Sequence, residues 1–151
     1  MKKIFLFSLI VFAIFSVFSL SNYFFYKNPY KPNALVKNHF FKLEIAKTDQ
    51  QKAIGLAKYN IIPQGFGMLF PFGKPGMYAF WMKNMKFPID IIFIRDGKIV
   101  RIFSNVPPPK FPDSPLPIYK TDSLTDTVLE INAGLSEKYG FKNGDSVKIG
   151  L

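Results

Sequence analysis

The chain has 151 residues, of which 48% are hydrophobic and none is cysteine. This length suits one domain and is too short for two ordinary ones, and the apolar content excludes general disorder. Without cysteine there is no disulfide and no thiolate site, and the lone His39 with few carboxylates argues against a zinc or iron centre. We therefore expect neither a metal nor a cofactor.

The net charge of +10 is concentrated in the first 86 residues. Residues 1–36 carry four lysines and no acid, residues 37–86 carry eight lysines against two acids, and residues 87–151 are balanced. Such a surplus is either ordinary solubility charge or an attraction to anionic lipid headgroups, a wall polymer or nucleic acid. Because no Lys/Arg block is longer than a pair and no RNA-binding signature is present, we expect no nucleic-acid partner.

The N-terminus has the pattern of an export signal, with Lys2-Lys3 before an apolar run over residues 4–20. This predicts either a signal peptide cleaved after Ser21, which would release a secreted or periplasmic domain, or an uncleaved signal anchor over residues 1–26. We favour a membrane-spanning anchor, because the run approaches the ~20 residues that cross hydrocarbon. The basic pair places the N-terminus in the cytoplasm, so the domain is expected outside the cytoplasmic membrane, after a proline-containing linker over residues 27–38.

The first part of the predicted domain combines two short strands with a helix. Residues 39–47 alternate between apolar and polar side chains, which predicts a half-buried strand. Thr48 and Gln51 have the spacing of a capping box, so a short helix is expected to begin there. Residues 68–70 predict a short buried strand, and the glycines and proline of residues 73–76 predict a turn after it.

The stretch 77–83 holds the only tryptophan, Trp81, and reads as a strand. Its alternating positions make two faces, both largely apolar: Tyr78, Phe80 and Met82 on one, and Ala79, Trp81 and Lys83 on the other. We therefore expect a central, interior strand in which Trp81 is largely buried.

Residues 89–104 predict a β-hairpin. Asp96-Gly97 stands between two apolar runs and is the strongest short hairpin signal, typical of a type I′ turn. With these two residues as the loop, uninterrupted pairing puts Asp90 diagonally opposite Arg101 on one face, within reach of an ion pair.

The last third of the chain continues the β pattern. Residues 105–117 contain six prolines and predict a stiff, extended surface loop. A strand is expected over residues 128–133, a short helix over 135–139, and a final strand over 147–151. About seven short strands and two short helices make the fold class mainly β (β-dominated α+β), a small barrel-like domain over residues 39–151.

Several stretches of this domain together resemble the DUF192 family, also catalogued as UPF0127. They are Gly67-Met68-Leu69-Phe70, Phe80-Trp81-Met82-Lys83-Asn84, Pro88-Ile89-Asp90-Ile91-Ile92-Phe93-Ile94, Asp96-Gly97-Lys98-Ile99-Val100 and Val128-Leu129-Glu130-Ile131-Asn132-Ala133-Gly134. The resemblance implies a small β-barrel-like fold in a prokaryotic, often exported protein whose function is unassigned. Relatives often continue Gly55-Leu56 with methionine and arginine, where this chain has Ala57-Lys58-Tyr59, and many carry two cysteines in the proline-rich loop, where this chain has none.

Trp81, Lys83 and Asn84 are the first candidates for a binding site, because an aromatic platform beside a cation and an amide suits a sugar or a nucleobase. The alternative is that Trp81 belongs to the core, while Lys83 and Asn84 end the strand and begin a turn.

Asp90, Glu130 and Asn132 are the second set of candidates. Two carboxylates on neighbouring strands can serve as acid and base when they lie a few ångströms apart in different environments. The alternative is that Asp90 pairs with Arg101 or Lys83, while Glu130 and Asn132 satisfy backbone groups or face water.

No triad, metal cluster or phosphate-binding loop is present, so we expect no catalytic residue. The sequence favours a membrane-tethered, extracytoplasmic binding or accessory module, expected to be a monomer. Its partner would be the membrane itself through the N-terminal helix, with an envelope protein, a glycan or an anionic lipid headgroup as ligand. The alternative function is an envelope hydrolase that uses Asp90 and Glu130.

Overall fold

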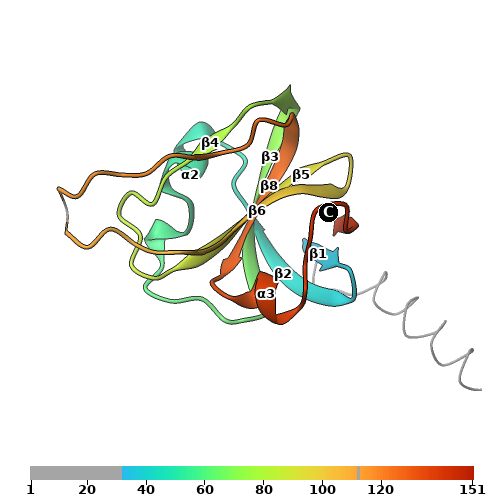
Figure 1. Cartoon of the computed structure of the whole chain (residues 1–151), viewed down its shortest axis with the longest axis horizontal. Helices are drawn as coiled ribbons and strands as arrows, with labels where there is room; N and C mark the ends of the chain where they lie inside the picture. The colour runs from blue at the N-terminus through green and yellow to red at the C-terminus, as the bar shows by residue number, and fades with distance from the viewer. Residues whose placement is uncertain (1–31, 112) are drawn as a thin grey trace, which may run out of the picture. The chain divides into compact units, whose positions relative to one another are not determined.

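The computed structural model describes residues 32–111 and 113–151, which form a curled β-sheet, a second small sheet and short helices (Figure 1). The mainly β fold class is therefore confirmed. The predicted signal anchor at residues 1–26, and residues 27–31 of the predicted linker, lie outside the described residues. Within the described ranges, no helix has the length and apolar character needed to cross a membrane.

The described strands and helices follow one another closely along the chain. They are β1 (Asn33–Val36), β2 (His39–Ile45), α2 (Asp49–Ile54), the 3-10 helix η1 (Gly55–Lys58), β3 (Phe66–Gly76), β4 (Ala79–Phe80), β5 (Ile89–Arg95), β6 (Lys98–Val106), β7 (Tyr119–Lys120), β8 (Thr125–Asn132), α3 (Leu135–Lys138) and β9 (Val147–Gly150). The main sheet has the order β6-β5-β8-β3-β2-β1-β9, and β4 pairs only with β7. Within the main sheet, β2 and β3 are parallel and the other neighbours are antiparallel.

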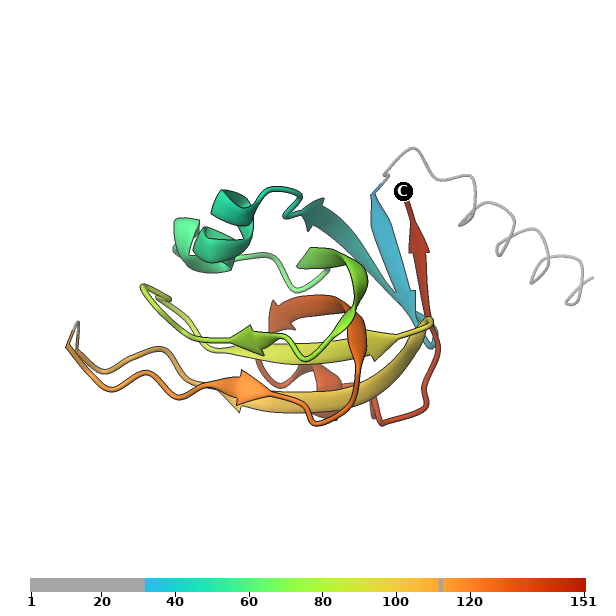
Figure 2. The ribbon, with the colours of Figure 1, turned by 90° about the horizontal axis from the view of Figure 1, so that it is seen from above.

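The main sheet curls into a half-barrel whose two edge strands meet at one end (Figures 1 and 2). The Val147 amide donates to the Gly97 carbonyl at 2.8 Å, and the Ile99 amide donates to the Asp145 carbonyl at 3.0 Å. These bonds join the turn between β5 and β6 to the segment that leads into β9. At this end the outer strands therefore have partners for backbone groups that an open edge would leave free.

Both faces of the central strands are buried, against two separate hydrophobic clusters. Alternate residues of β3, β5 and β8 enter different clusters: Leu69, Ile92 and Leu129 pack in one, while Phe70, Phe93 and Val128 pack in the other. This explains why β5 is apolar at every position from Ile91 to Ile94 and does not alternate there with polar residues. It also means that two adjacent residues of one of these strands face different surroundings.

The hairpin predicted over residues 89–104 is confirmed, with its turn at Asp96-Gly97. Both turn residues have positive φ, 48° and 68°, as a type I′ turn requires. The predicted uninterrupted pairing is wrong, because the register shifts between Phe93 and Ile94 and again between Ile89 and Ile91. A bulge adds a residue to one strand and displaces every later pair, so the expected contact between Asp90 and Arg101 does not form.

The predicted linker extends too far, because its residues 33–36 form β1, between β2 and β9. Ala34 and Val36 are fully buried and alternate with residues that are only partly buried. This pattern is short and directly follows Pro32, which favoured the interpretation as a linker. The turn predicted at 73–76 instead lies within the far end of β3, where the pairing with β8 becomes irregular.

The predicted interior strand over residues 77–83 is also wrong. Only Ala79 and Phe80 are extended and paired, and their partner is β7 in the small second sheet. Trp81, expected in the core, is 47% exposed. The reason is that β8 pairs with both β3 and β5 and occupies the central place that we assigned to residues 77–83. The alternation itself holds, since Phe80 and Met82 turn inward while Ala79 and Trp81 are exposed.

Candidate ligand-binding pocket

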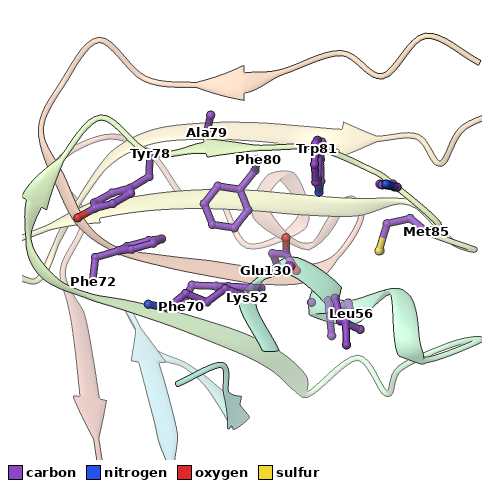
Figure 3. A pocket seen from close by; sticks show the side chains of 14 residues that line it. Lys52, Leu56, Phe70, Phe72, Tyr78, Ala79, Phe80, Trp81, Met85 and Glu130 are labelled. Carbon is purple, nitrogen blue, oxygen red and sulfur yellow. The ribbon is translucent and has the colours of Figure 1, made fainter. Parts of the chain in front are cut away.

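A pocket of about 230 Å³ opens between α2, the end of β3, the β4 segment and β8 (Figure 3). Aromatic and aliphatic side chains make up most of its walls, and one carboxyl group lies at its base. The residues that line it are Lys52, Ala53, Ile54, Gly55, Leu56, Phe70, Phe72, Tyr78, Ala79, Phe80, Trp81, Lys83, Met85 and Glu130. Binding sites for small molecules commonly combine such apolar walls with a few polar groups.

The aromatic wall is held by ring contacts among its own members. Phe72 and Tyr78 stack with their ring centres 3.5 Å apart and 11° between their planes. Phe80 meets Phe70 edge to face at 5.1 Å, and it meets Phe93 of the core at 5.7 Å. The wall is therefore anchored in the hydrophobic cluster beneath it and does not depend on a ligand for its shape.

Trp81 and Met85 lie on the opposite side of the pocket from the stacked Phe72 and Tyr78 (Figure 3). Because Trp81 is half exposed and is the only tryptophan of the chain, its fluorescence reports directly on this pocket.

Glu130 lies at the base of the pocket, with only 5% of the residue exposed. It points to this face of the sheet because it pairs with Ile91 of β5 and Met68 of β3, both of which belong to the cluster on the pocket side. Among the described residues, none forms a hydrogen bond with its Oε2 atom. Burial raises the pKa of Glu130 to about 8, against the opposing effect of a backbone hydrogen bond from Leu56. Glu130 is therefore mostly protonated at pH 7, and its carboxyl can donate a hydrogen bond.

Gly55 allows the helical segment to lie close to this carboxyl group. It has φ 54° and ends α2, which begins at the predicted capping box of Thr48 and Gln51. A Cβ atom at position 55 would lie 3.4 Å from the Phe70 ring and 3.6 Å from Oε2 of Glu130. The positive φ, more than the contact distance, explains why a glycine stands here.

Two lysines lie at the pocket, each above an aromatic ring. Lys52 Nζ is 4.9 Å from the centre of the Phe72 ring, and Lys83 Nζ is 5.5 Å from the centre of the Trp81 ring. In the part of the chain that the structure describes, neither lysine forms a salt bridge. The pocket therefore carries two cations beside a carboxyl that is mostly neutral.

Of the six candidate site residues, the structure brings three together: Trp81, Lys83 and Glu130 line the same pocket. Asn84 follows directly, with φ 59° at an exposed turn, but does not line it. Asn132 is placed elsewhere, because its side-chain amide donates to the carbonyls of Ile62 and Pro63 and holds the segment before β3.

Asp90 lies on the opposite face of the sheet from Glu130. It pairs with Ile131, whose side chain belongs to the other hydrophobic cluster. Asp90 is fully buried, and its carboxylate accepts three backbone hydrogen bonds, from Asn105 at 2.8 Å, Gly134 at 2.9 Å and Ser136 at 2.7 Å.

Asp90 therefore joins the end of β6 to the start of α3, and the ion pair with Lys83 or Arg101 considered from the sequence is wrong. The paired arrangement with Glu130 that a two-carboxylate hydrolase needs is also not present in this geometry.

Among the residues of this pocket that sequence reasoning missed are Lys52, Gly55, Phe72, Tyr78 and Phe80. The capping box predicted the helix that carries Lys52, and the alternation around Phe80 predicted which side chains of that segment turn inward. Nothing in the sequence showed that α2 lies beside β8. Within the described ranges, no cluster of histidine, cysteine or acidic residues could hold a metal ion.

Comparisons with known proteins identify relatives without assigning a chemistry. The model of the DUF192 family, described as "Uncharacterized ACR", matches residues 33–149. A protein of unknown function from Novosphingobium aromaticivorans DSM 12444 has a similar structure, with a TM-score of 0.70, 32% identity, and coverage of 80% of this chain and 89% of that one. A protein of Sinorhizobium meliloti 1021, described as a putative transcription regulator, gives a TM-score of 0.69 and 30% identity, with coverage of 78% and 91%. No curated protein matches this chain at a significant level.

Proposed function

The chain belongs to the DUF192 family, and on that premise we propose that its domain is a non-enzymatic module that binds a small ligand in the pocket above Glu130. The observation that carries the proposal is the carboxyl group of Glu130, a residue that lines the pocket. Its buried Oε2 atom receives no hydrogen bond from any group of the described residues. A buried polar atom without a partner costs about 1–3 kcal/mol. Native proteins tolerate such costs mainly where function requires them.

The distribution of the family stretches supports the same pocket. Three of the five stretches that carry the resemblance contribute to its lining: one supplies Phe70, one supplies Phe80, Trp81 and Lys83, and one supplies Glu130. The other two stretches form the hairpin of β5 and β6. The family sequence pattern therefore describes the half-barrel together with this pocket.

The location of the module is part of the proposal. The basic pair and the apolar run that precede residue 32 favour a single-pass anchor, with the binding domain on the extracytoplasmic side of the membrane. An envelope glycan, an anionic headgroup or a segment of an envelope protein would then be within reach. Fractionation tests this point: membrane-bound protein whose domain is open to external protease supports it, and a soluble form that begins at Asn22 contradicts it.

The binding function is tested with a panel of small aromatic fragments of benzene size, titrated against the full-length protein and followed by Trp81 fluorescence. Saturable binding that shifts the NMR amide signals of α2, β4 and β8 supports the proposal. In cells, Glu130→Leu should fold but lose the role of the protein in a deletion-complementation assay, while the control Lys110→Met, on the exposed loop, should keep it. Fragments that bind only elsewhere, or a Glu130→Leu variant with full cellular function, would refute the pocket.

A further inference from the structure

The charges around the pocket indicate which kind of ligand it takes, if the proposed binding function holds. The titratable groups that line it with Glu130 are Lys52 from α2, and Tyr78 and Lys83 on either side of β4. The Tyr78 hydroxyl is already used, because it donates to the Lys74 carbonyl at 2.7 Å. The two lysines have aromatic faces but, among the residues described, no acidic partner.

Another acid on this face of the sheet is Glu44 on β2. Glu44 pairs with Met68, which in turn pairs with Glu130, so the three residues lie in one row across β2, β3 and β8. Its carboxylate accepts hydrogen bonds from Lys58 and Tyr59, and its charge is therefore compensated locally. It does not neutralise Lys52 or Lys83, and the pocket keeps a positive surplus.

We infer that the pocket takes a small organic anion with a planar apolar body, whose anionic group accepts a hydrogen bond from the Glu130 carboxyl in the field of Lys52 and Lys83. The planar body would lie against the aromatic side chains that line the pocket, namely Phe72, Tyr78, Phe80 and Trp81. Such an arrangement gives the Glu130 carboxyl a hydrogen-bond partner and places a negative charge in a pocket that is lined by two lysines.

The size of the pocket limits this anion to about one ring with a substituent. An apolar cavity of about 150 Å³ holds benzene, and typical drug-sized pockets begin at roughly 300 Å³. The present pocket of about 230 Å³ lies between these values. Benzoate is therefore a suitable probe, and benzamide and benzylammonium are neutral and cationic molecules of nearly the same shape.

The test is to measure the binding of these three probes to the full-length protein by Trp81 fluorescence between pH 6 and pH 9. Benzoate should bind about tenfold more tightly than benzylammonium at pH 6–7, since one charge-assisted contact is worth about that factor. Its affinity should fall as the pH rises above 8, because the Glu130 carboxyl then loses the proton that it donates.

Variants separate the contributions of the charged groups. Glu130→Gln, which keeps a donor but does not titrate, should bind benzoate at every pH of the range, without the fall above pH 8. Lys52→Met and Lys83→Met should each weaken benzoate about five- to tenfold and leave benzamide nearly unchanged. Lys110→Met, far along the exposed loop, is the matched control and should change neither.

The outcomes distinguish this inference from the proposed function beneath it. If benzylammonium binds most tightly and gains affinity above pH 8, the pocket is a cation site with an ionised Glu130, and the anion inference is wrong while the binding function stands. Equal binding of all three probes also overturns the inference alone. If no probe binds at millimolar concentration, and aromatic fragments fail too, both are wrong.

Discussion

Replacing Glu130 with glutamine removes one titration from the protein core while keeping nearly the same shape. In the folded protein, burial raises the pKa of Glu130 from an ordinary value of 4.5 to about 8. Between these two pH values the folded state holds a proton that the unfolded state has released. The free energy of unfolding of the wild type should therefore fall as the pH rises, with the stabilising contribution complete below pH 4.5 and lost through pH 8.

The size of the effect follows from the difference between the two pKa values. One pKa unit corresponds to about 1.4 kcal/mol, so the wild type should lose about 3 kcal/mol from this group between pH 4.5 and pH 7. The full difference above pH 8 amounts to about 5 kcal/mol. Glu130→Gln lacks this loss, so its stability relative to the wild type should grow by these amounts over the same range.

The assay is urea denaturation of the full-length protein, followed by circular dichroism at pH 5, 7 and 9. All other titrating groups are shared by the two proteins and cancel in the difference between them. A difference that stays constant within about 0.5 kcal/mol from pH 5 to pH 9 would show that Glu130 titrates normally in the folded protein. The carboxyl at the base of the pocket would then be ionised at pH 7 and could not donate a hydrogen bond.

Glu44→Gln is the matched control, since Glu44 lies in the same row of the sheet. Its partial burial alone would raise the pKa, but the hydrogen bonds from Lys58 and Tyr59 outweigh this effect and hold the pKa of Glu44 below its ordinary value. A lowered pKa contributes stability above pH 4.5 that is lost only as the pH falls, so this variant should show no trend between pH 6 and pH 9.

Two further substitutions test how the fold is held together, each measured by denaturation at one pH. Asp90→Ala should lower the free energy of unfolding by about 3 kcal/mol or more, because it leaves three backbone amides without their acceptor. Asp90→Asn keeps one oxygen and should lower it less. Equal and small losses of stability in the two variants would contradict the assigned role. Gly97→Ala should cost about 1 kcal/mol, since φ is 68° and the new Cβ would lie 3.2 Å from the Val147 carbonyl oxygen; an unchanged stability would contradict the strained turn.

The sequence predicted the elements whose signals are local. The capping box of Thr48 and Gln51 and the turn at Asp96-Gly97 depend on residues within four positions of each other, and both are present in the structure. The pairing beyond that turn was not predictable, because β6 has an additional residue relative to β5 at each of two register shifts. No pattern in residues 98–106 marks the two additional residues.

Trp81 shows the same limit for the binding site. An apolar run with tryptophan predicted an interior strand, since burial of large aromatic side chains is the common case. The central position depends on which strands pair over long distances, and β8 takes it. The site residues Trp81 and Lys83 could be selected from the sequence as an aromatic platform beside a cation, but Glu130 joined them through tertiary structure alone.

The two buried acidic residues of the central strands differ in their hydrogen bonding, and this difference supports a ligand at Glu130. Asp90 and Glu130 lie on adjacent strands, one residue out of register, and both are almost fully buried. At Asp90 the fold supplies three backbone amides to one side chain. At Glu130 the same sheet leaves Oε2 without any hydrogen bond from the described residues and places an aromatic pocket with two lysines in front of it. A leucine at position 130 would avoid the cost of this buried polar atom, so a polar partner that enters the pocket best explains why a carboxyl stands there.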